Sequence, residues 1–328
     1  MYTMNIFTYN ILSDSYCSPG FYTTCDPEHL KPEKRMNTLK DILREQIRLE
    51  SIICLQEITR VQESILQSFF NEQGYTLITC LYGKAWSGFM GVGIAVPKKF
   101  RVVDTKFVRV ADGKKWAKKE KPGRLSKLVT FFLTELGVMA EPERDPLEDA
   151  QNRQNVMVLL ELGFASCGPT FYIGTYHMPC AFRTPIVMTI HSALVAQAIQ
   201  KEAGDKPYIL AGDFNLKPSS DQYGLLTTGK MSATSNEHPL LPEGDDWTSD
   251  VKPMKSAYKE VSRLEPYFTN YAQSRGQPVF IECLDYIFYE GLKPMVVLDI
   301  PTRSAINGPL PNKEQPSDHV PIGATFEV

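Results

Sequence analysis

Short apolar runs of strand length alternate with longer amphipathic segments along this chain of 328 residues, and no repeat of about 20 to 50 residues is present. Apolar residues that recur at helical spacing, such as Leu39 and Leu43, predict helices over 32–50, 61–72 and 185–203. The predicted strands span 4–12, 51–56, 76–81, 91–96, 101–108, 155–162, 171–176, 207–211, 283–289 and 321–326. Each half of the chain thus supplies a sheet with its own helices, which indicates an α/β fold with two mixed sheets packed as a sandwich.

Two charged stretches break this alternation. Residues 98–127 contain twelve basic and three acidic residues, and residues 141–149 are mostly acidic and contain proline. Because blocks of like charge usually stay solvated, we expect flexible loops at about 110–127 and 141–152. A phosphate-binding role is the alternative for the basic stretch.

Charge and cysteine content limit the classes of protein that the chain could belong to. The net charge is -3, so a polyanion would have to bind to a local basic patch. The seven cysteines are widely spaced and form no C-x-x-C pair, which argues against a disulfide framework and against zinc. With neither a secretory signal nor a membrane span expected, the sequence favours a cytoplasmic or nuclear protein with reduced thiols.

Polar residues lie next to the apolar runs, mostly at the C-terminal ends of the predicted strands, where a sheet presents side chains to a shared site. They are Asn10, Glu57, His177, Asp213, Asn215, Asp285, Asp318 and His319. Taken singly, each has an ordinary explanation as a turn residue, a helix cap or an exposed loop residue. The chain has five histidines, and His191, inside a predicted helix, is expected at the surface.

The chemistry of the whole set is more specific than that of its members. Hard oxygen ligands such as Glu57, Asp318 and Asn10 suit Mg²⁺, or Mn²⁺ in its place. An Asp next to a His, with another Asp on a separate strand, provides an imidazole and a carboxylate to orient it. This combination is suited to the hydrolysis of phosphoesters.

The ordered series "TYNIL", "LQE", "GTYH", "GDFN", "LDYIF" and "SDHVP" resembles the endonuclease/exonuclease/phosphatase superfamily, which has a DNase I-like fold. The segments "YNILSDSY", "DPEHLKPEKRMNTLKDIL" and "EPYFTNYAQ" resemble its branch of CCR4-type deadenylases, nocturnin, Angel proteins and 2′,5′-phosphodiesterase. The resemblance implies a four-layer α/β/β/α arrangement. It runs from residue 10 to residue 319, so residues 1–328 are expected to form a single catalytic domain.

The resemblance also implies a role for each matching residue. Glu57 would be the principal metal ligand, with Asn10 and Asp318 completing or supporting the site. Asp213 and Asn215 would position the attacking water and the scissile phosphate. No Ser or Cys lies in an activated setting, so a covalent intermediate is not expected.

Further roles fall on the second half of the chain. Asp285 would orient His319, and His177 would donate a hydrogen bond to the phosphoryl oxygens as charge develops. Phe268 and Asn270, in "YFTNY", match the part of the deadenylases that cradles a base, where an aromatic face would stack on it.

Three departures from the family pattern bear on the substrate. Leu12 stands where base-excision endonucleases carry an acidic residue, which disfavours DNA repair. The segments "GFMGVGIAV" and "MPCAF" differ from the branch pattern near the fourth strand and after His177, and no adaptor domain is evident.

The sequence therefore favours a Mg²⁺-dependent phosphodiesterase, specifically a 3′-to-5′ exoribonuclease that acts on single-stranded RNA. A nucleotide-directed phosphatase and a 2′,5′-oligoadenylate phosphodiesterase are the alternatives. An inactive RNA-binding module and a lipid phosphodiesterase remain further alternatives.

Overall fold

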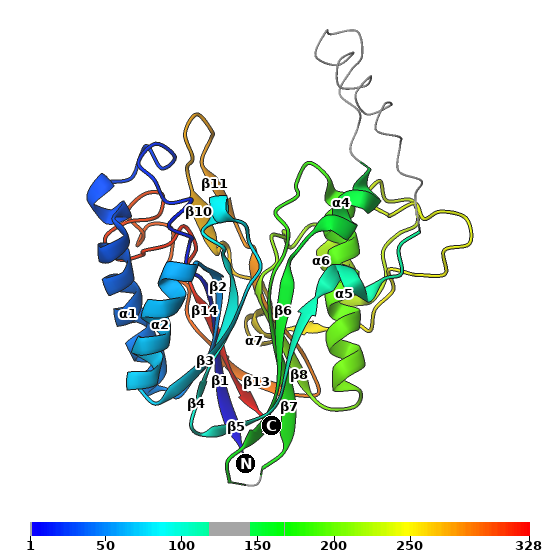
Figure 1. Cartoon of the computed structure of the whole chain (residues 1–328), viewed down its shortest axis with the longest axis horizontal. Helices are drawn as coiled ribbons and strands as arrows, with labels where there is room; N and C mark the ends of the chain where they lie inside the picture. The colour runs from blue at the N-terminus through cyan, green and yellow to red at the C-terminus, as the bar shows by residue number, and fades with distance from the viewer. Residues whose placement is uncertain (1, 118–144, 167) are drawn as a thin grey trace.

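Two six-stranded mixed sheets pack face to face in the computed structural model, which describes residues 2–117, 145–166 and 168–328 (Figure 1). The first sheet contains, in spatial order, β13 (Lys293–Val297), β14 (Ile322–Glu327), β1 (Thr3–Asn10), β2 (Ile52–Ile58), β4 (Gly91–Pro97) and β3 (Tyr75–Leu81). The second sheet contains β5 (Phe100–Arg109), β6 (Val156–Phe164), β7 (Thr170–His177), β8 (Tyr208–Asp213), β12 (Asp285–Glu290) and β9 (Lys255–Ser256). A separate hairpin pairs β10 (Asn270–Ala272) with β11 (Phe280–Glu282).

Helices cover the outer faces of both sheets, as Figure 1 shows. The α-helices are α1 (Pro32–Arg48), α2 (Arg60–Glu72), α4 (Pro146–Asn152), α5 (Pro185–Ala203), α6 (Asp221–Thr228) and α7 (Ala257–Ser262). The short 3-10 helices are η1 (Pro27–Leu30), η2 (Ala85–Ser87) and η3 (Val110–Gly113). No helix in the described ranges is long and apolar enough to cross a bilayer.

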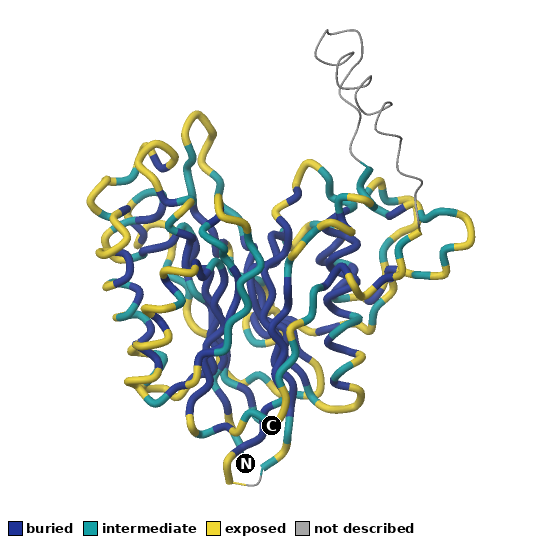
Figure 2. Tube along the Cα trace, in the orientation of Figure 1, coloured by how far each residue is buried: buried dark blue, intermediate teal, exposed yellow. Residues whose placement is uncertain are grey.

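Three apolar layers hold these elements together, and the buried segments run through the middle of the molecule in Figure 2. One layer lies between the sheets, where Ile6 and Cys54 of the first sheet pack with residues of the second, such as Ile173. A second layer joins the first sheet to α1 and α2 through residues such as Leu43 and Phe70. The third joins the second sheet to α5 and α6. The predicted four-layer α/β/β/α sandwich is therefore confirmed.

The two sheets do not correspond to the two halves of the chain, which corrects the sequence-based prediction. Strand β5 pairs with β6 of the second sheet, with Lys106 opposite Leu159. The C-terminal strand β14 pairs with β1 of the first sheet, with Thr3 opposite Glu327. Each sheet therefore contains strands from both halves of the chain.

The described parts of the two predicted loops contain short helices. In η3, Val110 and Ala111 are buried, and the ammonium of buried Lys114 forms an ion pair with Asp245 between two tryptophan rings. Residues 145–152 contain the helix α4, whose first turn has a proline. Residues 118–144 lie outside the described ranges.

His191 is buried in α5 and not at the surface as expected. Helix α5 is apolar on nearly all sides because α4, α6 and η3 pack against it as well as the sheet. The Nε2 atom of His191 donates to the carbonyl of Ala150 at 3.0 Å, and its Nδ1 accepts from the hydroxyl of Tyr176 at 2.8 Å. Burial lowers the pKa of His191 to about 4.

This buried imidazole predicts a loss of stability in acid. Between pH 6.5 and 4 the unfolded chain binds a proton at His191 that the folded protein does not, so the free energy of unfolding falls as the pH falls. The loss should approach about 3 kcal/mol. Urea unfolding across this pH range should show a shallower dependence in His191→Gln, and equal dependence in both proteins would contradict the assignment.

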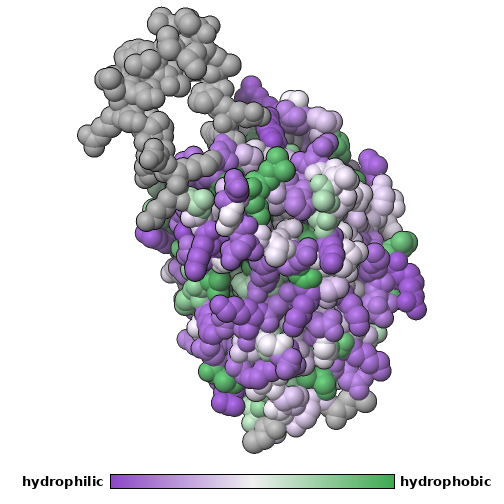
Figure 3. Space-filling model, turned by 90° about the vertical axis from the view of Figure 1, so that its right-hand side faces the viewer, coloured by the Kyte–Doolittle hydropathy of each residue, from purple (hydrophilic) through white to green (hydrophobic). Residues whose placement is uncertain are grey.

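The face of the molecule on the α5 side is mostly hydrophilic, with hydrophobic side chains in small separate groups (Figure 3). The six cysteines within the described ranges are free thiols.

Candidate active site

The polar strand ends meet at one end of the sandwich, opposite the end where the two termini lie (Figure 1). Strands β1 and β2 are parallel, as are β7 and β8, so the carboxyl ends of each pair adjoin. Asp213, the last residue of β8, is in register with His177 on one side and with Asp285 on the other. Asp285 begins an antiparallel strand, which is why a strand start joins a group of strand ends.

One carboxylate oxygen of Asp213 links the two sheets. Its Oδ2 accepts a hydrogen bond from Nδ2 of Asn10, at the end of β1, over 2.9 Å. The same oxygen lies 3.5 Å from Nε2 of His177 and 3.6 Å from Nε2 of His319. All four side chains are buried, so Asp213 is the centre of a cluster of buried polar side chains from both sheets.

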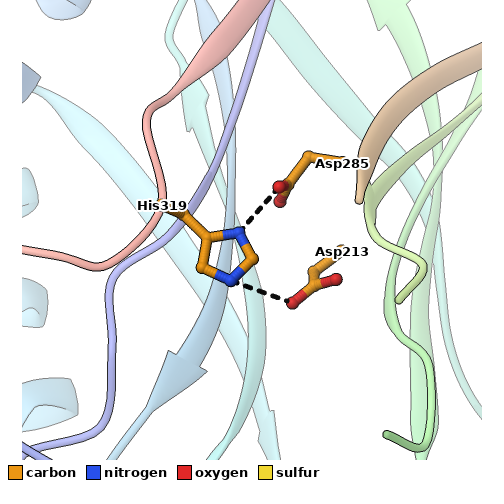
Figure 4. A group of neighbouring side chains, drawn as sticks. All are labelled: Asp213, Asp285 and His319. Atoms are coloured by element: carbon orange, nitrogen blue, oxygen red, sulfur yellow. Dashed lines mark hydrogen bonds and ion pairs between the residues drawn. The ribbon is translucent and has the colours of Figure 1, made fainter. Parts of the chain in front are cut away.

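Asp285 and His319 form a close pair beside Asp213, as Figure 4 shows. Nδ1 of His319 lies 2.7 Å from Oδ2 of Asp285. Burial alone would lower the pKa of His319, but the carboxylates of Asp285 and Asp213 outweigh it and raise the pKa well above its usual value. The imidazolium form is therefore favoured, with Nε2 directed at Asp213.

Matching turns follow the ends of β1 and β8. Oδ1 of Asn10 accepts from the backbone N–H of Leu12 at 3.0 Å, and Oδ1 of Asp213 accepts from the backbone N–H of Asn215 at 2.9 Å. Leu12 and Asn215 both have left-handed backbones, with φ of 56° and 52°. Such a conformation is costly for leucine, although asparagine tolerates it, and it often accompanies functional sites. The two turns orient Asn10 and Asp213 toward each other.

Glu57 lies near the end of β2 and also has a left-handed backbone, with φ of 64°. Its Oε2 accepts from the backbone N–H of Ser13 at 2.8 Å, and its Oε1 accepts from Nδ2 of Asn10 at 3.2 Å. Helix α2 starts just beyond, where Thr59 caps its first turn through a capping box. The side chain of Asn10 thus contacts the carboxylates of both Glu57 and Asp213.

Asp318 and Asn270 lie beside this cluster. Oδ2 of Asp318 accepts from the hydroxyl of Tyr22 at 2.9 Å and from Nδ2 of Asn270 at 3.3 Å. The backbone of Asn270 forms a bridge with that of His319. The structure therefore places both predicted residues next to the Asp–His pair.

Arg35 supports the site but carried no signal in the sequence. Arg35, buried in α1, donates to Oδ1 of Asp14 and to the backbone carbonyls of Ile11 and Pro316, which tie together the segments that precede Ser13 and Asp318. Its position three residues after a helix-starting proline is ordinary for a surface arginine. Only the structure reveals its contacts.

Phe268 is not an open stacking surface, which corrects the prediction for this residue. Its side chain is 1% exposed and packs with Tyr271, Ile306, Leu310 and Val320. The neighbouring Tyr267 is 74% exposed. In this structure, Phe268 contributes to the packing beneath Asn270.

This burial changes what the Phe268→Ala substitution should do. Removal of a buried phenylalanine ring creates a cavity and is expected to lower the free energy of unfolding by about 3 to 5 kcal/mol. Tyr267→Ala, at the exposed neighbour, should change it by no more than about 1 kcal/mol. Denaturant unfolding of both variants measures the difference, and a Phe268→Ala protein as stable as the parent would contradict the packing role.

The donor set fits a hard divalent cation. Four carboxylates, those of Glu57, Asp213, Asp285 and Asp318, lie at this end of the sandwich, and none forms an ion pair with a lysine or arginine of the described ranges. One oxygen of Asp285 is buried without a hydrogen-bond partner. Ligand atoms of Asp213, Asp285 and His319 lie within 4.8 Å of one another and could hold a metal ion.

A model of the Endonuclease/Exonuclease/phosphatase family matches residues 7–319. The chain belongs to this family. The match includes every residue of the cluster, so the chain is a hydrolase of this family with a buried Asp–His group that could hold a metal.

Individual relatives are distant. Carbon catabolite repressor protein 4 homolog 1 of Arabidopsis thaliana is 24% identical, over 99% of this chain and 58% of that protein. The CCR4-Not complex 3′-5′-exoribonuclease subunit Ccr4 of Saccharomyces cerevisiae is 25% identical, over 99% of this chain and 39% of that protein. The chain thus spans less than two thirds of the length of these curated relatives.

A solved structure supports the fold. ANGEL2, described as a 2′,3′-cyclic phosphatase in complex with adenosine-2′,3′-vanadate, superposes with a TM-score of 0.74 at 19% identity, covering 99% of this chain and 95% of that chain. The match confirms the expected DNase I-like arrangement.

Proposed function

We propose that this chain is a Mg²⁺-dependent phosphodiesterase that releases nucleotides from the 3′ end of single-stranded RNA. The observation that carries the proposal is the cluster around Asp213, in which one carboxylate oxygen faces two histidines and an asparagine from both sheets. The relative described as the CCR4-Not complex 3′-5′-exoribonuclease subunit Ccr4 supports the choice of RNA.

The residues divide the chemistry between the two sheets. Asp213 would hold the attacking water and accept its proton, because its Oδ2 is directed into the cluster. The imidazolium of His319, held by Asp285, would donate to the phosphoryl oxygens, with His177 on the other side of Asp213. Asn215 is held by the turn at Asp213 and would help position the phosphate.

The cation would be held from the first sheet. Glu57 is the principal candidate ligand, with Asn10 and Asp318 completing or supporting the site, as their oxygen donors suit Mg²⁺ and also Mn²⁺. When bound, the cation would supply charge neutralisation at the phosphate.

The basic stretch 98–127 gives less support to RNA binding than its composition indicated. Within its described part, Lys106 pairs with Glu202, Arg109 with Asp112 and Lys114 with Asp245, so these cations are already neutralised locally. The proposal therefore depends on the site and not on this stretch.

The test is a panel of substrates, each incubated separately with the protein and Mg²⁺. The panel contains 3′,5′-oligo(A), 2′,5′-oligo(A), mixed-sequence RNA, single-stranded DNA, NADPH and an RNA that ends in a 2′,3′-cyclic phosphate. Stepwise release of AMP from 3′,5′-oligo(A), abolished by EDTA, supports the proposal. Phosphate release from NADPH alone, cleavage of only the 2′,5′-linked or cyclic substrates, or no turnover of any would overturn it.

A further inference from the structure

Trp86 stands exposed at the rim of the active site. It lies in η2, within the connection between β3 and β4, and its side chain is 70% exposed. Gly91, the first residue of β4, pairs both with Leu81 at the end of β3 and with Ile58 at the end of β2. The connection therefore lies at the end of the first sheet where Glu57 is found. An exposed tryptophan here is unusual, since this residue is mostly buried in proteins.

Hydrogen bonds connect this segment directly to the catalytic cluster. The Oγ of Ser87 accepts from the backbone N–H of Lys84 at 3.1 Å, which closes the turn around Trp86. The Oγ of Ser13 donates to the carbonyl of Ser87 at 3.4 Å, and the backbone N–H of Ser13 donates to Glu57 at 2.8 Å. Trp86 is thus held at a fixed position relative to Glu57.

A second aromatic ring and one lysine adjoin Trp86. The ring of Tyr16 lies 6.1 Å from that of Trp86 with an interplanar angle of 55°. Lys84, two residues before Trp86, is exposed and forms no ion pair with a carboxylate in the part of the chain that the structure describes, whereas the guanidinium of Arg60 lies 4.2 Å from the centre of the Phe89 ring.

The other two tryptophans are in a different setting. Trp116 and Trp247 are partly buried on the other side of the molecule and pack on either side of Lys114, with indole N–H groups that donate to Ala111 and Gln197. Trp86 is the tryptophan that presents its ring to solvent.

We propose that Trp86, with Tyr16 beside it, is the stacking surface for a nucleobase of the substrate. This inference rests on the proposed function and assigns base recognition to the β3–β4 connection in place of the buried ring of Phe268. Stacking on an aromatic face recognises any base, and the exposed Lys84, two residues before Trp86, could neutralise an adjoining phosphate. The ligand class is therefore a nucleobase joined to a phosphate.

The fluorescence of Trp86 gives a readout that does not need turnover. In EDTA, we expect AMP and a short oligo(A) to quench the emission of the parent protein, because a stacked base quenches an exposed indole, and ribose 5-phosphate to leave it unchanged. Trp86→Phe should lose this quenching, since Trp116 and Trp247 are remote. Equal quenching in the variant, or by ribose 5-phosphate, would overturn the inference.

Affinity provides an independent measurement. Anisotropy of a fluorescein-labelled tetra-adenylate should show the Kd rising about 5- to 100-fold in Trp86→Ala and by a smaller factor in Trp86→Phe, which keeps an aromatic face. Leu264→Ala, at a residue 75% exposed just beyond α7, is the matched control and should leave Kd unchanged. An unchanged Kd in Trp86→Ala would overturn the inference.

The outcomes for the two proposals can be told apart. Hydrolysis of 3′,5′-oligo(A) with equal KM in Trp86→Ala and the parent would retain the proposed function and reject the stacking role. Base-dependent quenching at Trp86 without hydrolysis of any substrate would retain the stacking surface and reject the proposed function.

Discussion

Replacement of Asp213 by asparagine is expected to lower kcat by about 10³-fold, within the range of roughly 10²- to 10⁴-fold typical of a lost general base. Asparagine has the same shape and can still accept the hydrogen bond from Nδ2 of Asn10, but it cannot take up a proton from water. Steady-state kinetics on the substrate identified by the panel measure the effect. The change should fall mainly on kcat, since Asp213 acts on the attacking water and not on the bound base.

The control for this prediction is Asp205→Asn, an exposed aspartate between α5 and β8. It should leave kcat unchanged. Thermal melting of both variants checks that the fold is retained. The double variant Asp213→Asn with His319→Ala should lose less than the product of the two single effects, because both groups act on one phosphate. Full activity of Asp213→Asn would show that Asp213 has no role in the reaction.

Much of the fold could be predicted because local patterns determine it. The apolar runs gave strand positions within a few residues, as for β7, expected at 171–176 and observed at Thr170–His177. Polar residues at the strand ends indicated the site, since parallel strands bring their carboxyl ends together. The site residues Asn10, Asp213 and His319 lie far apart in sequence, and the structure joins them through direct contacts.

What could not be predicted depends on distant packing partners. The pairing of β14 with β1 joins the two ends of the chain, and no local pattern specifies it. The burial of Phe268 depends on Ile306 and Leu310, which follow much later in the sequence. His191 is buried because α4 covers α5. Of these features, only helix α4 could have been predicted from the sequence, because the Asp145–Pro146 pair is typical of a helix start.

The strained backbones around the site connect its geometry to its function. Leu12, Glu57 and Asn215 lie at or near strand ends with positive φ, and this conformation costs about 1 kcal/mol or more at Leu12 and at Glu57, whereas asparagine tolerates it. Hydrogen bonds that fix the directions of Asn10, Glu57 and Asp213 offset this conformational cost. The folded protein thus gives up some stability in order to orient the side chains of the site. Substitutions of these side chains should therefore impair activity far more than folding.

Glu57→Gln is the sharpest test of this view. Glutamine keeps the size of the side chain and can still accept from Ser13, but it removes the charge that would hold the cation. A carboxylate close to a cation contributes roughly 4 kcal/mol at an effective dielectric constant of about 20, which corresponds to about a thousandfold in affinity. We therefore expect the Mg²⁺ concentration needed for half-maximal activity to rise by about that factor.

Melting temperature gives the second measurement for Glu57→Gln. Mg²⁺ that binds the folded protein raises the melting temperature of the parent, and the variant should lack this rise at the same concentration. Without Mg²⁺ the two proteins should melt alike, because Glu57 is not part of the apolar core. Glu290→Gln is the matched control, since Glu290 ends the strand that Asp285 begins and is exposed at the opposite end of the sheet. If Mg²⁺ raised the melting temperature of Glu57→Gln as much as that of the control, Glu57 would not be the main ligand. The cation would then be assigned to Asp213, Asp285 and His319, whose ligand atoms are also close enough to hold one.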